Sequence, residues 1–310
     1  MSEINVLYCF DNNFWRLAAV SIRSLVRCQK NPVVVHCMVP PRTHGRRQIQ
    51  KIVAEYGGRV VWRVVKVREN PYAGRDFSRW SPVIFYRLFA HRMFPHLDKI
   101  LYLDSDTLVC GDVAELYNTD IKKYAMGAIR DMAVIESTTQ GGKLDVEHVR
   151  MFVDKYLKHG LYVNSGVLLI NVKKMPKVES RLLAVDVPLK YPDQDLLNVG
   201  LDGKIYELPL RYNREPSVVI QDGVDVDMAS PVIQHFYALK PYFYMPDTKE
   251  VYSQFFKMAT PLGFYPEDFA RADFQRHQKR FKRGHDATTH IPHLRIDRRG
   301  RLRLFGVFRV

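Results

Sequence analysis

The sequence predicts an α/β fold built around a mostly parallel, doubly wound sheet. Over the first hundred residues, short apolar runs alternate with segments whose apolar residues recur at helical spacing. Strands that alternate with helices favour parallel βαβ units. The 310 residues, 46% hydrophobic and 26% charged, are enough for one large globular domain with a small appendage.

Turn and capping residues set the limits of the expected elements. Gly57 and Gly58 are typical of a helix C-terminus, and Ser81 followed by Pro82 is typical of a helix start. In chain order, we expect a strand at 6–10, a helix at 14–27, a strand at 33–39, a helix at 43–56, a strand at 60–67, a helix at 81–94 and a strand at 99–103.

The middle of the chain is less regular. Two further apolar runs predict strands at 126–129 and 163–170, and a polar run around Gly141 and Gly142 predicts a loop. A short helix is expected at 191–199, entered from Pro192. We find no internal repeat and no low-complexity segment.

The C-terminal region changes character near residue 261. Residues 271–310 carry twelve Arg or Lys against three Asp. We expect a basic helix at 267–283, a loop at 284–291 and a basic hairpin from strands at 293–297 and 301–305. We therefore divide the chain into a catalytic domain at 1–260 and a basic region at 261–310. Basic stretches interleaved with Phe and Leu suit an anionic membrane surface, and the alternative is a subdomain with a solvated basic face.

The overall charge indicates an anionic partner but does not decide which kind. A net charge of +14 and a pI near 9.6 attract nucleotide phosphates, nucleic acid or an acidic membrane. The basic residues concentrate in the C-terminal region, and no aromatic–basic RNA-binding signature is present, so the sequence disfavours a nucleic-acid partner.

Cysteine usage and the N-terminal residues indicate a cytoplasmic protein. The cysteines form no CxxC pair, and Cys9 and Cys37 lie inside apolar runs, which predicts buried free thiols in a reducing compartment. The sequence begins directly with a strand-like run, without a secretory signal, and contains no apolar run of about 20 residues.

Two acids stand directly after the strand expected at 99–103. Residues i and i+2 of an extended chain point to one side, so Asp104 and Asp106 would present adjacent carboxylates. Their repulsion is relieved by a hard divalent ion such as Mg²⁺ or Mn²⁺. Asp11 similarly follows the first strand, at the sheet edge where this architecture binds ligands.

DSDT has three other interpretations. A turn with a capping Asp needs no metal. An EF-hand loop is excluded because Leu108 and Val109 occupy the fifth and sixth positions. A haloacid-dehalogenase-like phosphatase or phosphotransferase, with Asp104 as nucleophile, stays open although Thr107 comes one residue too early.

Four motifs together resemble the family 8 glycosyltransferases. YLDSDTLV, YVNSGVLLINVKK, YPDQDLLN and IQHFYALKPY occur in the family's order, and the similarity covers roughly residues 4–260. The resemblance implies the GT-A fold, a single α/β domain with a nucleotide-binding first half. It also implies a retaining, metal-dependent transfer from a nucleotide sugar, as in bacterial lipopolysaccharide galactosyl- and glucosyltransferases.

The resemblance assigns roles to individual positions. Asp104, Asp106 and His235 match the metal ligands. The positions matched to nucleotide-sugar binding are Cys9, Asp11, Asn13, Arg87, Ser105 and Lys240, with Lys240 on the diphosphate. The positions matched to the surroundings of the donor sugar, which we treat as catalytic, are Asp131, Asn164, Asp193 and Gln194.

The motifs also have structural interpretations, and one departs from the family. YVNSGVLLIN could be a buried strand with a bulge at 164–166, DQD a solvated helix start, and His235 a structural histidine. The family's HF-x-G-x-x-KPW is one residue shorter here, with Ala238 and Tyr242 in place of Gly and Trp.

The sequence thus predicts a retaining hexosyltransferase that uses Mn²⁺ or Mg²⁺. It would move galactose or glucose from UDP-galactose or UDP-glucose to a saccharide or glycolipid acceptor, in the lipopolysaccharide core or another surface glycan. It would act in the cytoplasm, with peripheral attachment to the inner face of the plasma membrane through the basic region. A self-glucosylating primer such as glycogenin shares the family, but no tyrosine stands out as its acceptor.

Overall fold

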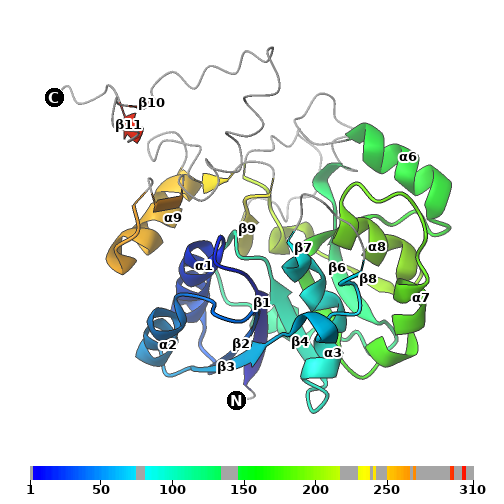
Figure 1. Cartoon of the computed structure of the whole chain (residues 1–310), viewed down its shortest axis with the longest axis horizontal. Helices are drawn as coiled ribbons and strands as arrows, with labels where there is room; N and C mark the ends of the chain where they lie inside the picture. The colour runs from blue at the N-terminus through cyan, green and yellow to red at the C-terminus, as the bar shows by residue number, and fades with distance from the viewer. Residues whose placement is uncertain are drawn as a thin grey trace.

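The computed structural model describes residues 3–74, 81–133, 146–216, 230–237, 240–241, 250–265, 268–269, 294–296 and 302–304. A seven-stranded sheet lies at its centre, in the order β3-β2-β1-β4-β7-β6-β8 (Figure 1). Its strands are β1 (Ile4–Cys9), β2 (Val33–Val39), β3 (Arg59–Val64), β4 (Lys99–Leu103), β6 (Met126–Arg130), β7 (Val163–Asn171) and β8 (Ile205–Leu208). Only β7 runs antiparallel to its neighbours, so the expected, mostly parallel α/β sheet is confirmed.

The strands are apolar throughout because both faces of the sheet are covered. In β4, Leu101 and Leu103 pack into one core, and Ile100 and Tyr102 pack into the other. The first core is completed by α1 (Trp15–Cys28), α2 (Arg46–Glu55) and α9 (Glu250–Ala259). The second is completed by η2 (Pro82–Phe89), α3 (Ala90–Met93), α7 (Glu179–Leu183) and α8 (Pro192–Gly200).

The prediction of one α-helix at 81–94 is wrong for most of that segment. Residues Pro82–Phe89 form a 3₁₀-helix, η2, and only Ala90–Met93 are α-helical. The expected start is confirmed, because the Ser81 hydroxyl accepts a hydrogen bond from the backbone N–H of Val83. Three residues per turn align Ile84 with Arg87, and both side chains line the same cavity.

Strand order brings distant segments to one edge of the sheet. The carboxyl ends of the parallel strands β1, β4 and β6 meet there. Because β7 is antiparallel to β4, the start of β7 lies at this edge too. Beyond β4, β5 (Thr107–Val109) pairs with β9 (Ile233–His235), and this small second sheet places Thr107 opposite His235.

The remaining described elements are short. They are η1 (Val67–Glu69), α4 (Ala114–Asn118), α6 (Val146–Tyr156), η3 (Met175–Lys177), η4 (Leu210–Tyr212) and η7 (Thr260–Leu262). Cys9 and Cys37 are buried free thiols, as expected. The described ranges contain no helix long and apolar enough to cross a bilayer.

The C-terminal region is described only in part. Strands β10 (Leu294–Ile296) and β11 (Leu302–Leu304) pair antiparallel, which confirms the two strands of the expected hairpin. The loops expected near Gly141 and at 284–291 lie outside the described residues, as does the basic helix expected at 267–283 apart from residues 268–269. Phe264 and Phe269 pack in the first core, and the domain boundary at residue 260 stays a prediction.

Candidate active site

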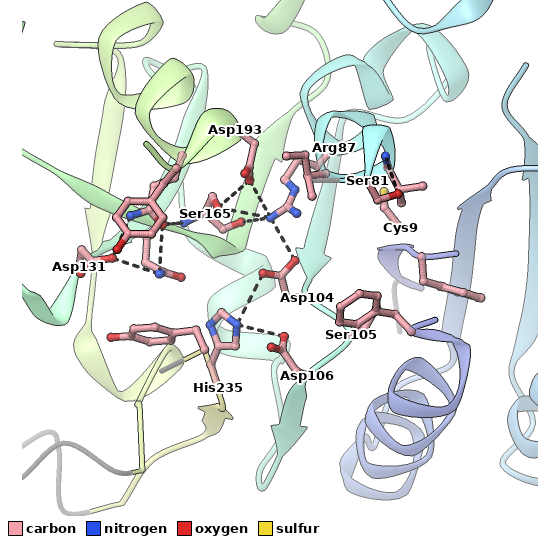
Figure 2. Close-up of a pocket in the computed structure, with 18 of the residues that line it drawn as sticks. Cys9, Ser81, Arg87, Asp104, Ser105, Asp106, Asp131, Ser165, Asp193 and His235 are labelled. Atoms are coloured by element: carbon pink, nitrogen blue, oxygen red, sulfur yellow. Dashed lines mark hydrogen bonds and ion pairs between the residues drawn. The ribbon is translucent and has the colours of Figure 1, made fainter. Parts of the chain in front are cut away.

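A cavity of about 720 Å³ opens at the sheet edge where β1, β4 and β7 meet (Figure 2). It gathers described residues from eight separate segments of the sequence. The predicted site residues that line it are Cys9, Asp11, Arg87, Asp104, Ser105, Asp106, Asp131, Asn164, Asp193, Gln194, His235 and Lys240. Asn13 is exposed and does not line the cavity, and its backbone N–H donates to Asp11 Oδ1 at 2.8 Å.

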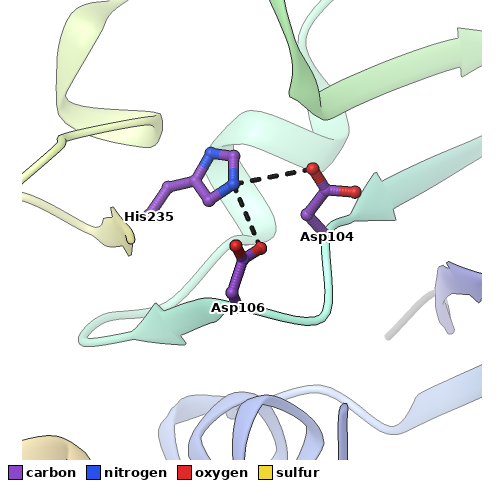
Figure 3. Close-up of side chains that lie close together, drawn as sticks. All are labelled: Asp104, Asp106 and His235. Atoms are coloured by element: carbon purple, nitrogen blue, oxygen red, sulfur yellow. Dashed lines mark ion pairs between the residues drawn. The ribbon is translucent and has the colours of Figure 1, made fainter. Parts of the chain in front are cut away.

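Asp104, Asp106 and His235 bring their ligand atoms within 4.8 Å of one another (Figure 3). His235 Nε2 lies 3.2 Å from Asp106 Oδ1 and 3.5 Å from Asp104 Oδ2. The pairing of β5 with β9 explains how a histidine so far along the chain reaches both acids.

The His235 ring can lie this close to the two acids because Gly166, near the start of β7, has no side chain. A Cβ at this position would lie 2.0 Å from His235 Cε1 and 2.9 Å from Asp104 Oδ2. The sheet also bulges here, as expected at 164–166. Ala128 of β6 pairs with Leu168 and Ile129 with Asn164, so the intervening residues of β7 have no partners on β6.

The donor set of this cluster fits a divalent cation. His235 is 1% exposed, yet its Nε2 has no hydrogen-bond partner, so the histidine is not a satisfied core residue. Two carboxylates and one imidazole nitrogen suit Mn²⁺ or Mg²⁺. A buried nitrogen that makes no hydrogen bond and faces two acids is the arrangement that a cation would complete.

Lys240 reaches the cluster despite the shortened motif around it. Its ammonium group is paired with Asp106 and also donates to the backbone carbonyl of Phe236 at 3.1 Å. Burial alone would raise the pKa of Asp106, but the positive charge of Lys240 and the adjacent His235 hold that pKa well below its usual range. Asp106 is therefore an anion in the folded chain.

Arg87 links the acids of the cluster to the far side of the cavity. Its Nη1 lies 3.0 Å from Asp104 Oδ1 and 3.4 Å from Asp193 Oδ2, and donates to the carbonyl of Ser165 at 2.8 Å (Figure 2). Burial alone would lower the pKa of Arg87, but Asp104, Tyr102 and Asp193 outweigh it and raise the pKa. The guanidinium is therefore a fixed positive charge between two acidic side chains.

On the far side, buried amides and acids form one hydrogen-bonded network. Asn164 Nδ2 donates to Asp131 Oδ2 at 3.1 Å and to Gln194 Oε1 at 3.2 Å, and Gln194 Nε2 donates to the same Asp131 oxygen at 3.1 Å. Ser165 Oγ donates to Asp193 Oδ2 at 2.9 Å. Burial raises the pKa of both Asp131 and Asp193.

This network decides between the interpretations of DQD. The motif does begin α8, but Asp193 and Gln194 are each 8% exposed and Asp195 is fully buried. A solvated helix start is therefore wrong. Asp195 instead holds the preceding loop, accepting from the backbone N–H groups of Lys190 and Tyr191.

Comparison with known proteins identifies the family. The profile of glycosyl transferase family 8 matches residues 5–245. The chain belongs to glycosyltransferase family 8. A lipopolysaccharide 1,2-glucosyltransferase of Escherichia coli (strain K12) is 32% identical over 220 residues, which are 68% of this chain and 62% of that protein. A putative glycosyltransferase of Haemophilus influenzae is 25% identical over 69% of this chain and 64% of its own length.

Solved structures show the same fold. The galactosyltransferase LgtC, in complex with donor and acceptor sugar analogs, superimposes with a TM-score of 0.68 over 87% of this chain and 100% of that chain, at 22% identity. The glycosyltransferase GlyE of Streptococcus pneumoniae TIGR4 does so with a TM-score of 0.59 over 89% of this chain and 64% of that chain, at 19% identity.

These comparisons confirm the expected family and its GT-A fold. They leave the phosphatase alternative without support, and the structure adds a reason. The Thr107 hydroxyl is fully buried, hydrogen-bonded to Ser21 Oγ and to the backbone carbonyl of Asp104. The chain spans less than two thirds of the length of the first curated relatives it matches.

Sequence reasoning missed several polar residues of the site. The Tyr102 hydroxyl donates to Asp104 Oδ1, and its ring lies 4.4 Å from the Arg87 guanidinium carbon. Tyr102 reads as one more apolar position of its strand, so no pattern distinguishes it. Ser165 stands inside a recognised motif, which was the only signal for its role. Asn213, which contacts His235, lies outside all the motifs.

Proposed function

We propose that the chain transfers galactose or glucose from a UDP-sugar to a saccharide acceptor, with retention of anomeric configuration and with Mn²⁺ or Mg²⁺. The observation that carries the proposal is the cluster of Asp104, Asp106 and His235, in which the buried Nε2 of His235 makes no hydrogen bond. The same cavity is lined by a network of polar side chains that could bind sugar hydroxyls. Membership of family 8 supports it.

The proposed metal site would be formed by Asp104, Asp106 and His235. A divalent ion held there would neutralise charge on the departing diphosphate. Lys240, which now pairs with Asp106, is close enough to turn its ammonium group to a diphosphate oxygen. Cys9, Asp11, Asn13, Arg87 and Ser105 are proposed to hold the rest of the nucleotide sugar.

The donor sugar is proposed to lie between Arg87 and the Asp131 network. Asp193, which accepts a hydrogen bond from Ser165 and pairs with Arg87, offers a carboxylate that can also accept hydrogen bonds from sugar hydroxyls. Gln194 Oε1 already accepts from the Asn164 side chain and from the backbone N–H of Ser165. We therefore assign Gln194 to positioning.

The acceptor and location follow from the relatives and the charge. A lipopolysaccharide core sugar, or another surface glycan, is the proposed acceptor because a relative is a lipopolysaccharide glucosyltransferase. The proposed location is the cytoplasm, with residues 261–310 on the anionic inner face of the plasma membrane, because twelve basic residues concentrate at 271–310.

The test is a panel of UDP-hexoses with the full chain, with and without Mn²⁺. One UDP-hexose together with Mn²⁺ should be slowly hydrolysed and should stabilise the fold, by about 2.7 kcal/mol at a ligand concentration of 100 times Kd. Proton NMR should show the α-anomer as the first sugar released. Metal-dependent release of the β-anomer would contradict retention.

Two matched variants locate the effect. Asp106→Asn should abolish both the hydrolysis and the stabilisation. Asp120→Asn changes an exposed loop acid, whose side chain is 69% exposed, and should change neither. Full metal-dependent turnover by Asp106→Asn would refute the proposed site.

A further inference from the structure

Asn213 lies directly behind the proposed metal-binding histidine. It follows η4, is 1% exposed, and places Oδ1 2.8 Å from His235 Nδ1. On its other side, Asn213 Nδ2 donates to Asn164 Oδ1 at 2.9 Å. The residue therefore joins the imidazole to the network around Asp131.

The backbone N–H of Gly166 fixes the direction of the hydrogen bonds that run from Asn164 through Asn213 to His235. The N–H of Gly166 can only donate, and it donates to Asn164 Oδ1 at 3.0 Å. The atom of Asn164 that faces Asn213 is therefore an oxygen, so Asn213 must turn its NH₂ group toward it. Asn213 then presents its own oxygen to His235 Nδ1, which must carry a proton.

We propose that Asn213 is a positioning residue that keeps His235 in the tautomer with its proton on Nδ1, so that Nε2 offers a lone pair to a metal ion. The inference rests on the proposed function, because it assigns His235 the role of metal ligand. It adds a residue that lies outside every motif that marks the site.

The two acids make this constraint necessary. Asp106 Oδ1 at 3.2 Å and Asp104 Oδ2 at 3.5 Å could each accept a hydrogen bond from a protonated Nε2. An imidazole free to choose would place its proton there, on the side of the carboxylates. That tautomer has no lone pair on Nε2 and cannot bind the ion.

Three variants separate the acceptor role of Asn213 from its link to Asn164 and from simple loss of a buried amide. Asn213→Ala removes both hydrogen bonds. Asn213→Asp keeps an acceptor for His235 Nδ1 but cannot donate to Asn164. Asn171→Ala is the matched control, because Asn171 is 9% exposed on β7 and donates to the carbonyls of Ile121 and Tyr124.

Two measurements read the effect without turnover. Nitrogen-15 NMR of the metal-free, histidine-labelled chain at alkaline pH, about 8.5, reports which ring nitrogen carries the proton, with His235→Gln as the assignment control. Electron paramagnetic resonance of free Mn²⁺ gives the metal affinity. Circular dichroism and thermal unfolding check that each variant folds.

We expect the wild type and Asn171→Ala to carry the His235 proton on Nδ1. Asn213→Ala should move the proton to Nε2 and weaken Mn²⁺ binding about 10–100-fold. Asn213→Asp should keep the Nδ1 proton and bind Mn²⁺ within about threefold of the wild type, or more tightly.

Two results would overturn the inference: a wild-type His235 protonated on Nε2, or a folded Asn213→Ala that keeps both the Nδ1 proton and wild-type affinity. If Asn213→Ala does not fold, the wild-type tautomer and Asn213→Asp decide. A wild type that binds no Mn²⁺ refutes the proposed metal site, whereas the metal-free NMR measurement still decides the tautomer.

Discussion

Adding one methyl group at Gly166 tests the geometry of the whole cluster. The Cβ of Gly166→Ala would lie 2.0 Å from His235 Cε1, about 1.4 Å short of ordinary contact, and 2.6 Å from its Nδ1. His235 is buried and hydrogen-bonded to Asn213, so a ring pushed aside would lose that hydrogen bond. Gly166 does not have positive φ, so the substitution acts by contact alone.

The expected magnitudes follow from that overlap. Overpacking of a buried site costs about 1–3 kcal/mol of the free energy of unfolding. Metal ligands must keep their distances within about 0.2 Å, so a ring displaced by more than 1 Å is lost as a ligand, and Mn²⁺ affinity should fall about 100-fold or more. Denaturant unfolding measures the first effect, and calorimetric titration with Mn²⁺ measures the second.

A matched glycine and a double mutant make the test specific. Gly127→Ala adds a Cβ in neighbouring β6, 3.1 Å from a Leu208 methyl group. This overlap is much smaller than the one at Gly166, so the substitution should cost less than about 1 kcal/mol. In a His235→Ala background, where the ring is absent, Gly166→Ala should lower the free energy of unfolding much less. An equal loss of stability with and without the ring would refute the clash, as would wild-type Mn²⁺ affinity in Gly166→Ala alone.

Three further predictions concern charge. Burial, together with nearby Arg59, lowers the pKa of His36 from 6.5 to about 4. The unfolded chain therefore binds the proton at higher pH than the folded chain does. The free energy of unfolding should fall as pH drops from 6.5 to 4, by at most about 3 kcal/mol. His36→Gln should flatten that loss in pH-dependent unfolding, and parallel curves would contradict it. Lys240→Met removes the cation that pairs with Asp106, so calorimetry should show Mn²⁺ binding about tenfold more tightly and UDP binding more weakly. Weaker Mn²⁺ binding would disprove competition between Lys240 and the metal ion for Asp106. Deleting residues 271–310, which keeps Phe269 in the core, should release the chain from anionic vesicles in a sedimentation assay, and unchanged binding would end the membrane proposal.

The sequence predicted the sheet and the acids well because local patterns determine both. Continuous apolar runs reveal strands buried on two faces, and the i, i+2 spacing of Asp104 and Asp106 places both carboxylates on one side. In the structure, all the matched residues except Asn13 line one cavity.

What the sequence could not predict depends on pairings between distant segments. His235 meets Asp106 only because two three-residue strands pair, and strands that short carry no periodicity. Asn213 is one asparagine in a turn, and its role exists only through two hydrogen bonds to residues far away in the chain. The 3₁₀ geometry of η2 was missed because apolar spacing in eight residues does not separate three residues per turn from 3.6.

The charges in contact across the cavity determine how Lys240 and the proposed metal ion would share one site. Asp104, Asp106 and Asp193 carry three negative charges against the two positive charges of Arg87 and Lys240. A divalent cation alone reverses the sign of this group, and a diphosphate alone deepens its negative charge. In the proposed complex, the two together would leave the balance unchanged, and Lys240 would turn from Asp106 to the diphosphate. We therefore expect the metal and the nucleotide to bind more favourably as a pair than either one alone.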